Sequence, residues 1–495
     1  MVEVLVRIRF AVLGAGFAMV LPPFNWPPYL VLFLMIPLID DARNSRIGLR
    51  LVSGVFFGLG FFLVLLKWLI VVGSDALLAL SFICALWWAL SNALSQFFFS
   101  SKYWVFWFAC SWTALEILRD RLPWGGFGWG QLGIIWTETP FAGLYSTFGQ
   151  IGMTFTTYLA IAYIYLHLRV RKTRFNVRFV SSVAISISLI IGISFVSHNF
   201  QPIVQHEKEK ISIGAIQGGV ANTGLGTLGP PRAVLNKHIT ETQNHLQTVN
   251  KLDLLVWPES SVDLDPYSDA TTLASLLEID LLVSPPILLG TTLYSDEGLK
   301  QNTSLLLRNE TLQWVYQKRH LVPFGEFLPL RGVIARYTDR ASLLSTDYES
   351  GTKAGSVSIE NLSLGVIICF EVADVSLVHE NIGSYSALLI QTNNATYQHL
   401  GQSEQQTAYN RVRALETKRP VLSVSTSGIS QIVNSDGEVV QQISQDETGM
   451  MSFEVEKISG LTIASRTLEV QITLILLGFF SGIALLVFRR FGMLT

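Results

Sequence analysis

Charged residues are scarce in this sequence. Asp, Glu, Lys and Arg make up only 15% of its 495 residues, while apolar residues make up 50%. A soluble globular protein carries about 25% charged residues, so this composition excludes an ordinary soluble protein and predicts a membrane protein. The formal net charge of −2 also excludes the strongly basic surface that binding to nucleic acid would require.

Cysteine is equally rare. Cys84, Cys110 and Cys369 lie far apart, so the sequence has neither a disulfide framework nor a cysteine-rich metal site. It also lacks the His-Glu-x-x-His motif of zinc proteases and the Gly-x-Ser-x-Gly motif of many Ser-His-Asp hydrolases. Because Cys84 and Cys110 fall inside apolar runs, Cys369 is the cysteine that lies in the polar part of the chain.

Long apolar runs fill the first 200 residues and return near the end. A membrane-spanning helix needs about 20 apolar residues, and we expect about eight such helices, the first two being short and the first uncleaved. They fall near residues 8–22, 28–39, 51–72, 76–97, 103–118, 149–167, 179–197 and 470–488. The sequence thus predicts a polytopic helical membrane domain over 1–200, a polar domain over 201–465, and a last helix with a basic tail over 466–495.

Basic residues predict the orientation of these helices, since Lys and Arg in short loops stay on the cytoplasmic side. Helices that alternate from an internal N-terminus place the following residues inside: Arg7, Arg9, residues 41–50, Lys102, Arg169, Arg171, Lys172, Arg174, Arg178, Arg489 and Arg490. The polar domain is then extracytoplasmic. Arg119 and Arg121 would lie outside, against the rule, beside the glycine- and tryptophan-rich loop 122–131. That loop is either a site for an acyl chain or headgroup or an ordinary interfacial aromatic belt.

In the polar domain, short apolar runs alternate with helical patterns, which predicts an α/β fold with sheets covered by helices. Helices are expected at 231–250 and 402–418. Strands are expected at 211–217, 252–257, 287–293, 303–307, 312–316, 364–370, 387–392, 421–425, 429–433 and 438–442.

Three of these strands end at residues that carry chemistry. The apolar run that begins at Leu364 is typical of a buried strand and leads to Cys369. A second strand runs through Trp257 and Pro258 to Glu259, and a third breaks into a loop at Lys318. Taken singly, Cys369 is more often a small core residue, and the two charges are more often surface salt bridges. Taken together, a thiol, an acid and an amine at strand ends form a coherent catalytic set.

The chemistry explains why these three side chains would be combined. A thiol is only slightly ionised at neutral pH, so a carboxylate that takes its proton makes it a nucleophile, and Glu259 would be that base. A fixed ammonium stabilises the oxyanion that forms when the nucleophile attacks a carbonyl. Lys318 would supply it, held by an acidic neighbour that is either Glu326 or Glu371. The sequence therefore predicts acyl transfer through a thioester on Cys369.

These segments carry a family resemblance. Trp257-Pro258-Glu259, Lys318-Arg319-His320 with Pro323-Phe324 and Glu326, and Cys369-Phe370-Glu371 resemble the Glu-Lys-Cys pattern of the nitrilase (carbon-nitrogen hydrolase) superfamily. The chain from about residue 10 to 488 resembles its apolipoprotein N-acyltransferase family, and details such as the Asn-Asn-Ala-Thr segment are similar to actinobacterial members. Residues in the order that family shows include Trp112, Glu116, Arg119, Pro123, Trp124, Phe127, Gly128, Asn393, Asn394, Ala395, Arg411, Arg413, Ala414, Glu416, Arg419 and 427–429.

The resemblance implies a fold and a reaction. An extracytoplasmic nitrilase-like αββα sandwich would accompany the helices in the cytoplasmic membrane of a bacterium, and no metal or cofactor would be needed. Cys369 would take an acyl chain from the sn-1 position of a phospholipid and pass it to the α-amino group of the diacylglyceryl-cysteine of an apolipoprotein. Glu326 and Glu371 would support the triad, and lipid would be bound by Trp124, Phe127, Trp129, Asn393 and Tyr397.

Two other classes of protein remain as alternatives. A membrane-anchored amidase or nitrilase would hydrolyse the same thioester with water, but a hydrolase of small nitriles has no need of eight helices. A transporter or receptor with a solute-binding outer domain is disfavoured, because the apolar helices contain few ionisable residues, chiefly Lys67 and Glu116.

Overall fold

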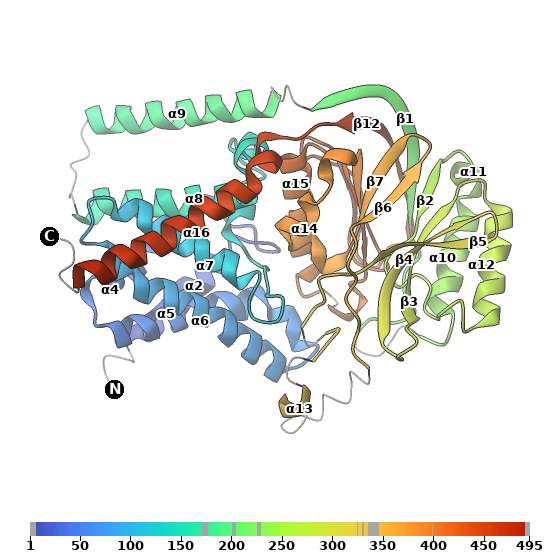
Figure 1. Ribbon diagram of the computed structural model, residues 1–495, viewed down its shortest axis with the longest axis horizontal. Helices are drawn as coiled ribbons and strands as arrows, with labels where there is room; N and C mark the ends of the chain where they lie inside the picture. The colour runs from blue at the N-terminus through green and yellow to red at the C-terminus, as the bar shows by residue number, and fades with distance from the viewer. Residues whose placement is uncertain are drawn as a thin grey trace. The chain divides into compact units, whose positions relative to one another are not determined.

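The computed structural model describes residues 6–170, 177–199, 204–224, 229–323, 325–328, 331–334, 346–397 and 399–490. Arg171, Lys172, Arg174 and Phe324, named above, lie outside these residues. The chain divides into two compact units, Met1–Gln201 with Ile463–Thr495, and Pro202–Thr462. The first is helical and the second contains the sheets (Figure 1).

Helices form the first unit at most of the expected apolar runs. Four are long and apolar enough to cross a membrane: Ile47–Leu65, Ser74–Phe98, Ala142–Val170 and Ile463–Ala484. The expected total of eight spans stays a prediction. The helices are α2 (Arg9–Ala18), α3 (Val31–Leu34), α4 (Ile36–Asn44), α5 (Ile47–Leu65), α6 (Ser74–Phe98), α7 (Trp104–Arg119), α8 (Tyr145–Tyr165) with its extension η6 (Leu166–Val170), α9 (Val177–Asn199) and α16 (Ile463–Arg490).

The segment expected as one helix over 28–39 is broken in the structure. A 3-10 turn, η2 (Pro28–Leu30), leads into α3. The helix is then interrupted at Met35, before α4 begins. Pro37 lies in the first turn of α4, where its missing N–H costs nothing, although the same residue inside a continuous helix would interrupt the hydrogen-bond ladder. The prediction of a single helix is therefore wrong here.

The sequence had suggested that Arg119 lies in a loop, but the structure places it in a helix. It is the last residue of α7, and its side chain is only 1% exposed. The guanidinium donates to the carbonyl oxygens of Phe127 and Trp129 and lies over the ring of Phe62, 5.3 Å from its centroid. The buried guanidinium thus holds loop 122–131 against the helices. Because Arg119 is not a loop residue, the rule that basic loop residues stay on the cytoplasmic side does not apply to it.

Small residues let two of the apolar helices pack closely. A Cβ atom on Gly54 of α5 would lie 2.5 Å from the Cα atom of Ala89 in α6, and one on Gly58 would lie 2.7 Å from the Cα atom of Ala85. Such close approach of backbones is how helices associate in a membrane, where burial of apolar surface gives no net attraction between them.

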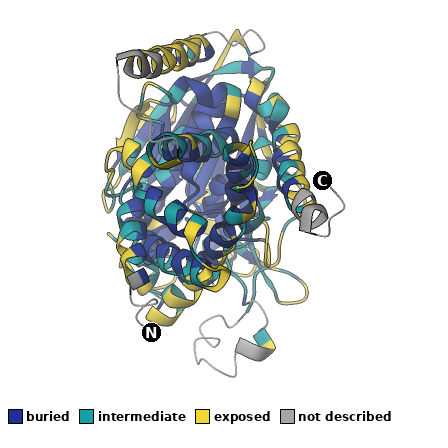
Figure 2. Cartoon of the chain, turned by 90° about the vertical axis from the view of Figure 1, so that its left-hand side faces the viewer, coloured by how far each residue is buried: buried dark blue, intermediate teal, exposed yellow. Residues whose placement is uncertain are grey.

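The large side chains that α9 exposes are apolar, as a lipid-facing helix requires. Ile185, Leu189, Phe195 and Val196 are each more than half exposed. Figure 2 shows the exposed surface running along this helix. A water-facing helix would carry polar residues there.

The second unit contains two six-stranded sheets. Sheet one has the order β12-β1-β2-β3-β4-β5, with β1 to β3 parallel; sheet two has the order β11-β10-β9-β8-β7-β6, with β7 to β9 parallel. The strands are β1 (Gln205–Gln217), β2 (Leu254–Val256), β3 (Ile287–Tyr294), β4 (Lys300–Arg308), β5 (Thr311–Gln317), β6 (Gly355–Ile359), β7 (Leu362–Ile368), β8 (Ala387–Thr392), β9 (Val421–Ser425), β10 (Ser430–Val433), β11 (Val439–Ile443) and β12 (Gly449–Ser459).

The two sheets pack face to face and helices cover their outer faces (Figure 1). Between the sheets, Val256 of β2 and Leu364 of β7 belong to one buried apolar cluster. A second cluster lies under the helices of sheet one and includes Trp257 and Leu276. The covering helices are α10 (Ala233–Asn244), α11 (Leu246–Val249) and α12 (Ala270–Leu282) on sheet one, and α14 (Val375–His379) and α15 (Gln402–Thr417) on sheet two. This is the expected αββα sandwich.

The sequence had not predicted two of the strands. β6 is a short edge strand of sheet two, and β12 is an edge strand of sheet one, paired antiparallel with β1. β6 alternates buried with exposed residues, and most residues of β12 are only partly buried. Predictions that relied on continuous apolar runs were bound to miss them.

Candidate active site

Cys369 follows the last residue of β7, where the chain turns sharply into the 3-10 helix η8 (Cys369–Ala373). Its φ of 55° lies in the left-handed region, which a residue with a Cβ rarely adopts. Strain of this kind is typical of functional sites, where the surrounding structure imposes it. Cys369 is 8% exposed, and its thiol lies close to the side chain of Thr392 at the end of β8.

Glu259 follows β2 after Trp257 and Pro258, and its side chain is 6% exposed. A bond between the sheets fixes this strand end, because Gln391 Nε2 of β8 donates to the Trp257 carbonyl oxygen at 2.6 Å. Gln391 is itself oriented by a hydrogen bond from the Ser304 hydroxyl. The acid and the thiol are therefore carried by two sheets that are tied together beside them.

Lys318 follows the last residue of β5 and is 1% exposed. Its ammonium Nζ lies 2.7 Å from Glu326 Oε1 and 3.6 Å from Glu259 Oε1. The Cys369 thiol lies close enough to the Glu259 carboxylate for each group to shift the pKa of the other. The three side chains predicted from the sequence thus meet in one place, and Glu326 is the acid that contacts the lysine.

Asn302 of β4 is a residue of the site that the sequence did not suggest. Its Nδ2 donates to Glu259 Oε1 at 2.7 Å and to Glu326 Oε1 at 3.1 Å. The main-chain carbonyl oxygen of Asn302 accepts a hydrogen bond from the backbone N–H of Lys318 at 2.9 Å. Asn302 therefore holds both carboxylates and the lysine backbone in register. Only the pairing of β4 with its neighbours shows this, since nothing in the local sequence marks the residue.

Glu371 is fully buried but makes no described contact with the Lys318 ammonium. Its Oε1 accepts from the Tyr316 hydroxyl at 2.7 Å and from the backbone N–H groups of Arg319 and His320 at 2.7 and 3.0 Å. Its Oε2 accepts from the N–H of Ile368 at 2.8 Å. Glu371 thus ties the end of the lysine strand to the end of the cysteine strand, a positioning role.

The electrostatics of the site suit a proton transfer from thiol to carboxylate. Burial, with the nearby Glu259, raises the pKa of Cys369 to about 12, so the resting group is a thiol. Burial also raises the pKa of Glu259, although Lys318 opposes the shift. For Lys318, burial alone would lower the pKa, but Glu326 and Glu259 raise it well above its usual value. The lysine therefore stays charged while the acid is poised to accept a proton.

These shifts predict how acylation of the enzyme depends on pH. Glu259 must be ionised to accept the thiol proton, so the rate falls as the pH drops through a pKa that lies above the ordinary value for Glu. Asn302→Leu removes a donor that lowers this pKa, and the fall should therefore move to higher pH. The measurement is the initial rate of thioester formation against pH. Gln301→Leu, the neighbour on the opposite face of β4, should leave the profile in place, and an unmoved profile in Asn302→Leu would contradict the assignment of the base.

Gly290 of β3 makes room for Glu259, which gives a second prediction. A Cβ atom there would lie 2.6 Å from the Pro258 carbonyl oxygen and 2.7 Å from the Glu259 Cα atom. Gly290→Ala should cost about 1–3 kcal/mol of unfolding free energy and, by displacing Glu259, lower activity about 10²-fold. Gly449→Ala is the matched control, since its Cβ would meet nothing closer than 3.6 Å. Thermal unfolding and acyl transfer would measure the two effects. Equal stability and equal activity of the two variants would show that position 290 tolerates a side chain.

The residues predicted to bind lipid are placed in different surroundings. Tyr397 lies near the Cys369 thiol, and burial, with a smaller effect of that thiol, raises the pKa of the Tyr397 hydroxyl. Asn393 accepts a hydrogen bond from Thr426 at 2.8 Å. In the helical unit, Trp124 is 43% exposed, whereas Phe127 and Trp129 are buried. The lipid-binding role of these residues stays a prediction.

Two family models match this chain. The apolipoprotein N-acyltransferase N-terminal domain matches residues 13–200, and the carbon-nitrogen hydrolase domain matches residues 232–459. The first match covers most of the helical unit and the second contains all of the residues that meet at the site.

Curated relatives match most of the chain. The apolipoprotein N-acyltransferase of Mycolicibacterium smegmatis is 27% identical over 92% of this chain and 81% of its own. That of Haemophilus influenzae is 26% identical over 89% of this chain and 87% of its own. Among solved structures, Nit3 of Saccharomyces cerevisiae, a member of branch 10 of the nitrilase superfamily, is 16% identical over 54% of this chain and 97% of its own, with a TM-score of 0.39.

Proposed function

The chain belongs to the apolipoprotein N-acyltransferase family of the nitrilase superfamily, and from that premise we propose that Cys369 carries an acyl group from a phospholipid to an apolipoprotein. The donor position is sn-1, and the acceptor is the α-amino group of an N-terminal diacylglyceryl-cysteine. The observation that carries the proposal is the meeting of a thiol, a carboxylate and an ammonium inside one buried site.

In the first half of the reaction the Cys369 sulfur attacks the ester carbonyl of the phospholipid while Glu259 takes the thiol proton. The oxyanion that forms is stabilised by the Lys318 ammonium and by a backbone N–H that follows Cys369. When the ester C–O bond breaks, Glu259 returns the proton to the leaving oxygen. A lysophospholipid leaves, and the acyl chain remains as a thioester on Cys369.

In the second half the amine of the lipoprotein attacks the thioester carbonyl. Glu259 now accepts a proton from the amine, the C–S bond breaks, and the proton returns to the Cys369 sulfur. Because Glu326 and Asn302 hold Lys318 and Glu259 in place, the same groups serve both halves without rearrangement. The products are an amide and the free enzyme.

A labelled phospholipid tests this function. Purified full-length protein in detergent is mixed with a phospholipid labelled in its sn-1 chain, and a diacylglyceryl-cysteine peptide is added later. We expect label on the protein in a hydroxylamine-labile bond, followed by its transfer to the peptide. Release of labelled fatty acid into water, with none on the peptide, would support instead the membrane-anchored carbon-nitrogen hydrolase.

The proposal also includes a location: a multi-pass protein of the cytoplasmic membrane, with the unit that contains the site on the extracytoplasmic side. The distribution of basic residues supports it. A cysteine introduced at the exposed Glu297 should then react with a membrane-impermeant maleimide in intact cells. One introduced at the exposed Arg46 should react only after the membrane is opened. The native cysteines are buried and should give little background, and the reverse pattern of labelling would contradict the proposed orientation.

A further inference from the structure

The 3-10 helix η8 that begins at Cys369 must hold a strained conformation. The φ of Cys369 is 55°, and a backbone strained in this way persists only where the surrounding structure holds it. Glu371 holds the start of η8, since its carboxylate accepts from the backbone N–H of Ile368 at 2.8 Å. The end of η8 is buried, and its carbonyl oxygens need donors too, because a buried carbonyl without a donor is costly.

Arg413 of α15 supplies these donors. Its Nε donates to the Val372 carbonyl oxygen at 2.7 Å, and its Nη2 donates to that of Ala373 at 3.1 Å. Its Nη1 pairs with Glu416, three residues further along the same helix, and both side chains are 0% exposed. One buried guanidinium thus ties α15 to the last two residues of η8.

This guanidinium is itself held firmly. Each of its three nitrogen atoms has an acceptor, and its Cζ atom lies 6.0 Å from the centroid of the Tyr409 ring. The helix that carries it packs against η8 and against β9, a central strand of sheet two. Arginine suits this task, because its planar group presents donors in a fixed geometry, whereas the lysine ammonium is a point charge. The position of η8 is therefore fixed relative to the sheet.

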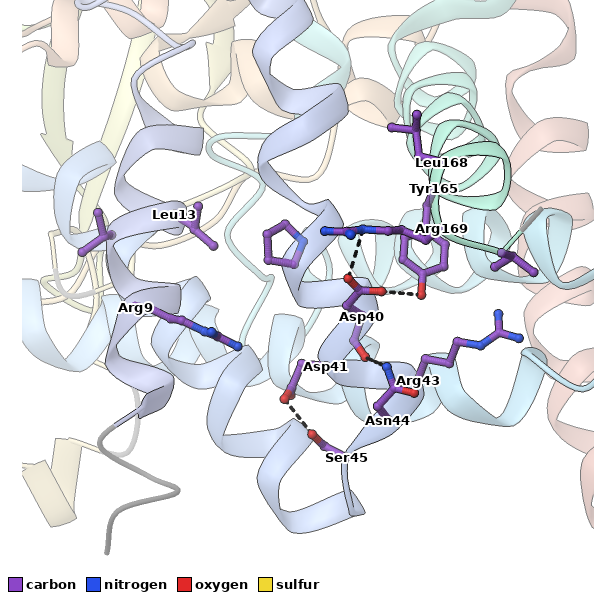
Figure 3. A pocket seen from close by; sticks show the side chains of 13 residues that line it. Arg9, Leu13, Asp40, Asp41, Arg43, Asn44, Ser45, Tyr165, Leu168 and Arg169 are labelled. Atoms are coloured by element: carbon purple, nitrogen blue, oxygen red, sulfur yellow. Dashed lines mark hydrogen bonds and ion pairs between the residues drawn. The ribbon is translucent and has the colours of Figure 1, made fainter. Parts of the chain in front are cut away.

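A charged cluster elsewhere in the chain shows a different arrangement. In a cavity of about 1230 Å³ within the helical unit, Asp40 accepts from the Tyr165 hydroxyl at 2.8 Å and pairs with Arg169 at 3.3 Å (Figure 3). Those contacts join one side chain to another. Arg413 instead donates to the main chain, so its removal would act directly on the path of the backbone beside the nucleophile.

We propose that Arg413 is a positioning residue of the acyl transfer, an inference that rests on the proposed function. By holding the end of η8, Arg413 fixes both the Cys369 thiol and the backbone N–H that follows it. The thiol must reach the carbon of the acyl carbonyl while that N–H donates to the oxygen of the same group. A displacement of about 1 Å would weaken both contacts and lower the rate about 10²-fold. Arg413 acts only through η8 and takes no part in proton transfer.

The test measures acylation of Cys369 by a p-nitrophenyl acyl ester, which requires neither phospholipid nor lipoprotein. Purified full-length protein in detergent is mixed with increasing ester, and the burst of nitrophenolate gives a maximal acylation rate and a half-saturating concentration. Cys369→Ala serves as the blank. Arg413→Met with Glu416→Gln removes the guanidinium without leaving a buried unpaired charge. We expect the maximal rate to fall about 10²-fold and the half-saturating concentration to stay unchanged.

Arg419→Met is the matched control for a loss of stability. Arg419 is also 0% exposed and lies just after α15. It donates to main-chain carbonyl oxygens outside η8, those of Tyr385, Thr417 and Gly460, at 3.0, 2.8 and 2.6 Å. Its substitution should lower the melting temperature by a similar amount and leave the acylation rate at the parental value. An equal loss of rate in the two variants would show that Arg413 is merely structural and would overturn the inference.

Arg413→Lys covers the case in which the double variant does not fold. It keeps a buried positive charge beside Glu416 but lacks the fork that donates to both carbonyl oxygens. The maximal rate should fall about tenfold, the effect of one weakened hydrogen bond. A folded Arg413 variant that acylates at the parental rate would overturn this inference and leave the proposed function standing. A parent protein that forms no acyl-enzyme with the ester would overturn both.

Discussion

Cys369→Ala is expected to form no acyl-enzyme and to reduce acyl transfer by about 10⁴–10⁶, the loss typical of removing a catalytic nucleophile. The thiol lies next to both Glu259 and Lys318, and it is a much better nucleophile than the neighbouring Tyr397 hydroxyl, whose pKa is raised by burial. The substitution removes only the sulfur atom and leaves the backbone unchanged, so the fold should stay intact. The measurements are thioester formation from labelled phospholipid, transfer to a diacylglyceryl-cysteine peptide, and thermal unfolding.

Cys110→Ala is the matched control, since Cys110 is also a buried free thiol but lies in α7 of the helical unit. It should transfer acyl groups at the parental rate. If Cys369→Ala kept more than about a hundredth of the parental rate, the covalent route would be refuted. Loss of activity together with loss of the folded state would be resolved with Cys369→Ser, which retains the size of the side chain but is a poorer nucleophile.

Lys318→Met should have the second large effect, and it should act on rate and on stability. Loss of an oxyanion donor costs about 10²–10³ in rate. It also leaves Glu259 and Glu326 buried without their cation, and breaking a buried ion pair in this way costs about 3–5 kcal/mol. Part of that loss should be recovered at low pH, where the carboxylates take up protons. Acyl-enzyme formation and thermal unfolding at two pH values would measure both effects.

A double variant separates the two roles of Lys318. Lys318→Met with Glu326→Gln removes one of the stranded charges, so it should regain stability and stay slow. Lys353→Met, an exposed lysine of the same unit, should change neither property. A double variant that regained both stability and rate would show that the lysine is structural and that another group stabilises the oxyanion.

Sequence patterns located Glu259, Lys318 and Cys369 for a physical reason. Lys318 and Cys369 follow directly on a strand and Glu259 follows one after Trp257 and Pro258, so the chemistry lies where an apolar run stops and a polar side chain begins. Such a boundary is visible without a structure. The same reasoning left Glu326 and Glu371 as equal candidates for holding the lysine, because the sequence does not show which acid the fold brings to the ammonium. The structure places Glu326 at the ammonium and Glu371 at the backbone.

Residues that depend on pairing between strands could not be predicted in this way. Asn302 contacts Glu259 because β3 and β4 pair in one register, and Gln391 ties the two sheets because they face each other. Arg119 was misplaced for a related reason. A basic residue near a predicted helix end suggests a loop, whereas its burial depends on carbonyl groups supplied by residues after the helix. The break between α3 and α4 had a visible signal in Pro37, but the apolar composition around it dominated the prediction.

The most direct test of the account is the location of the acyl group. Protein mixed with a phospholipid of defined chain length, without acceptor, is digested under conditions that preserve thioesters, and its peptides are identified by mass spectrometry. The account predicts one acyl chain on the peptide that contains Cys369, removed by hydroxylamine and by later addition of a diacylglyceryl-cysteine peptide. An acyl chain on another residue, or transfer to the peptide with Cys369 never modified, would contradict it.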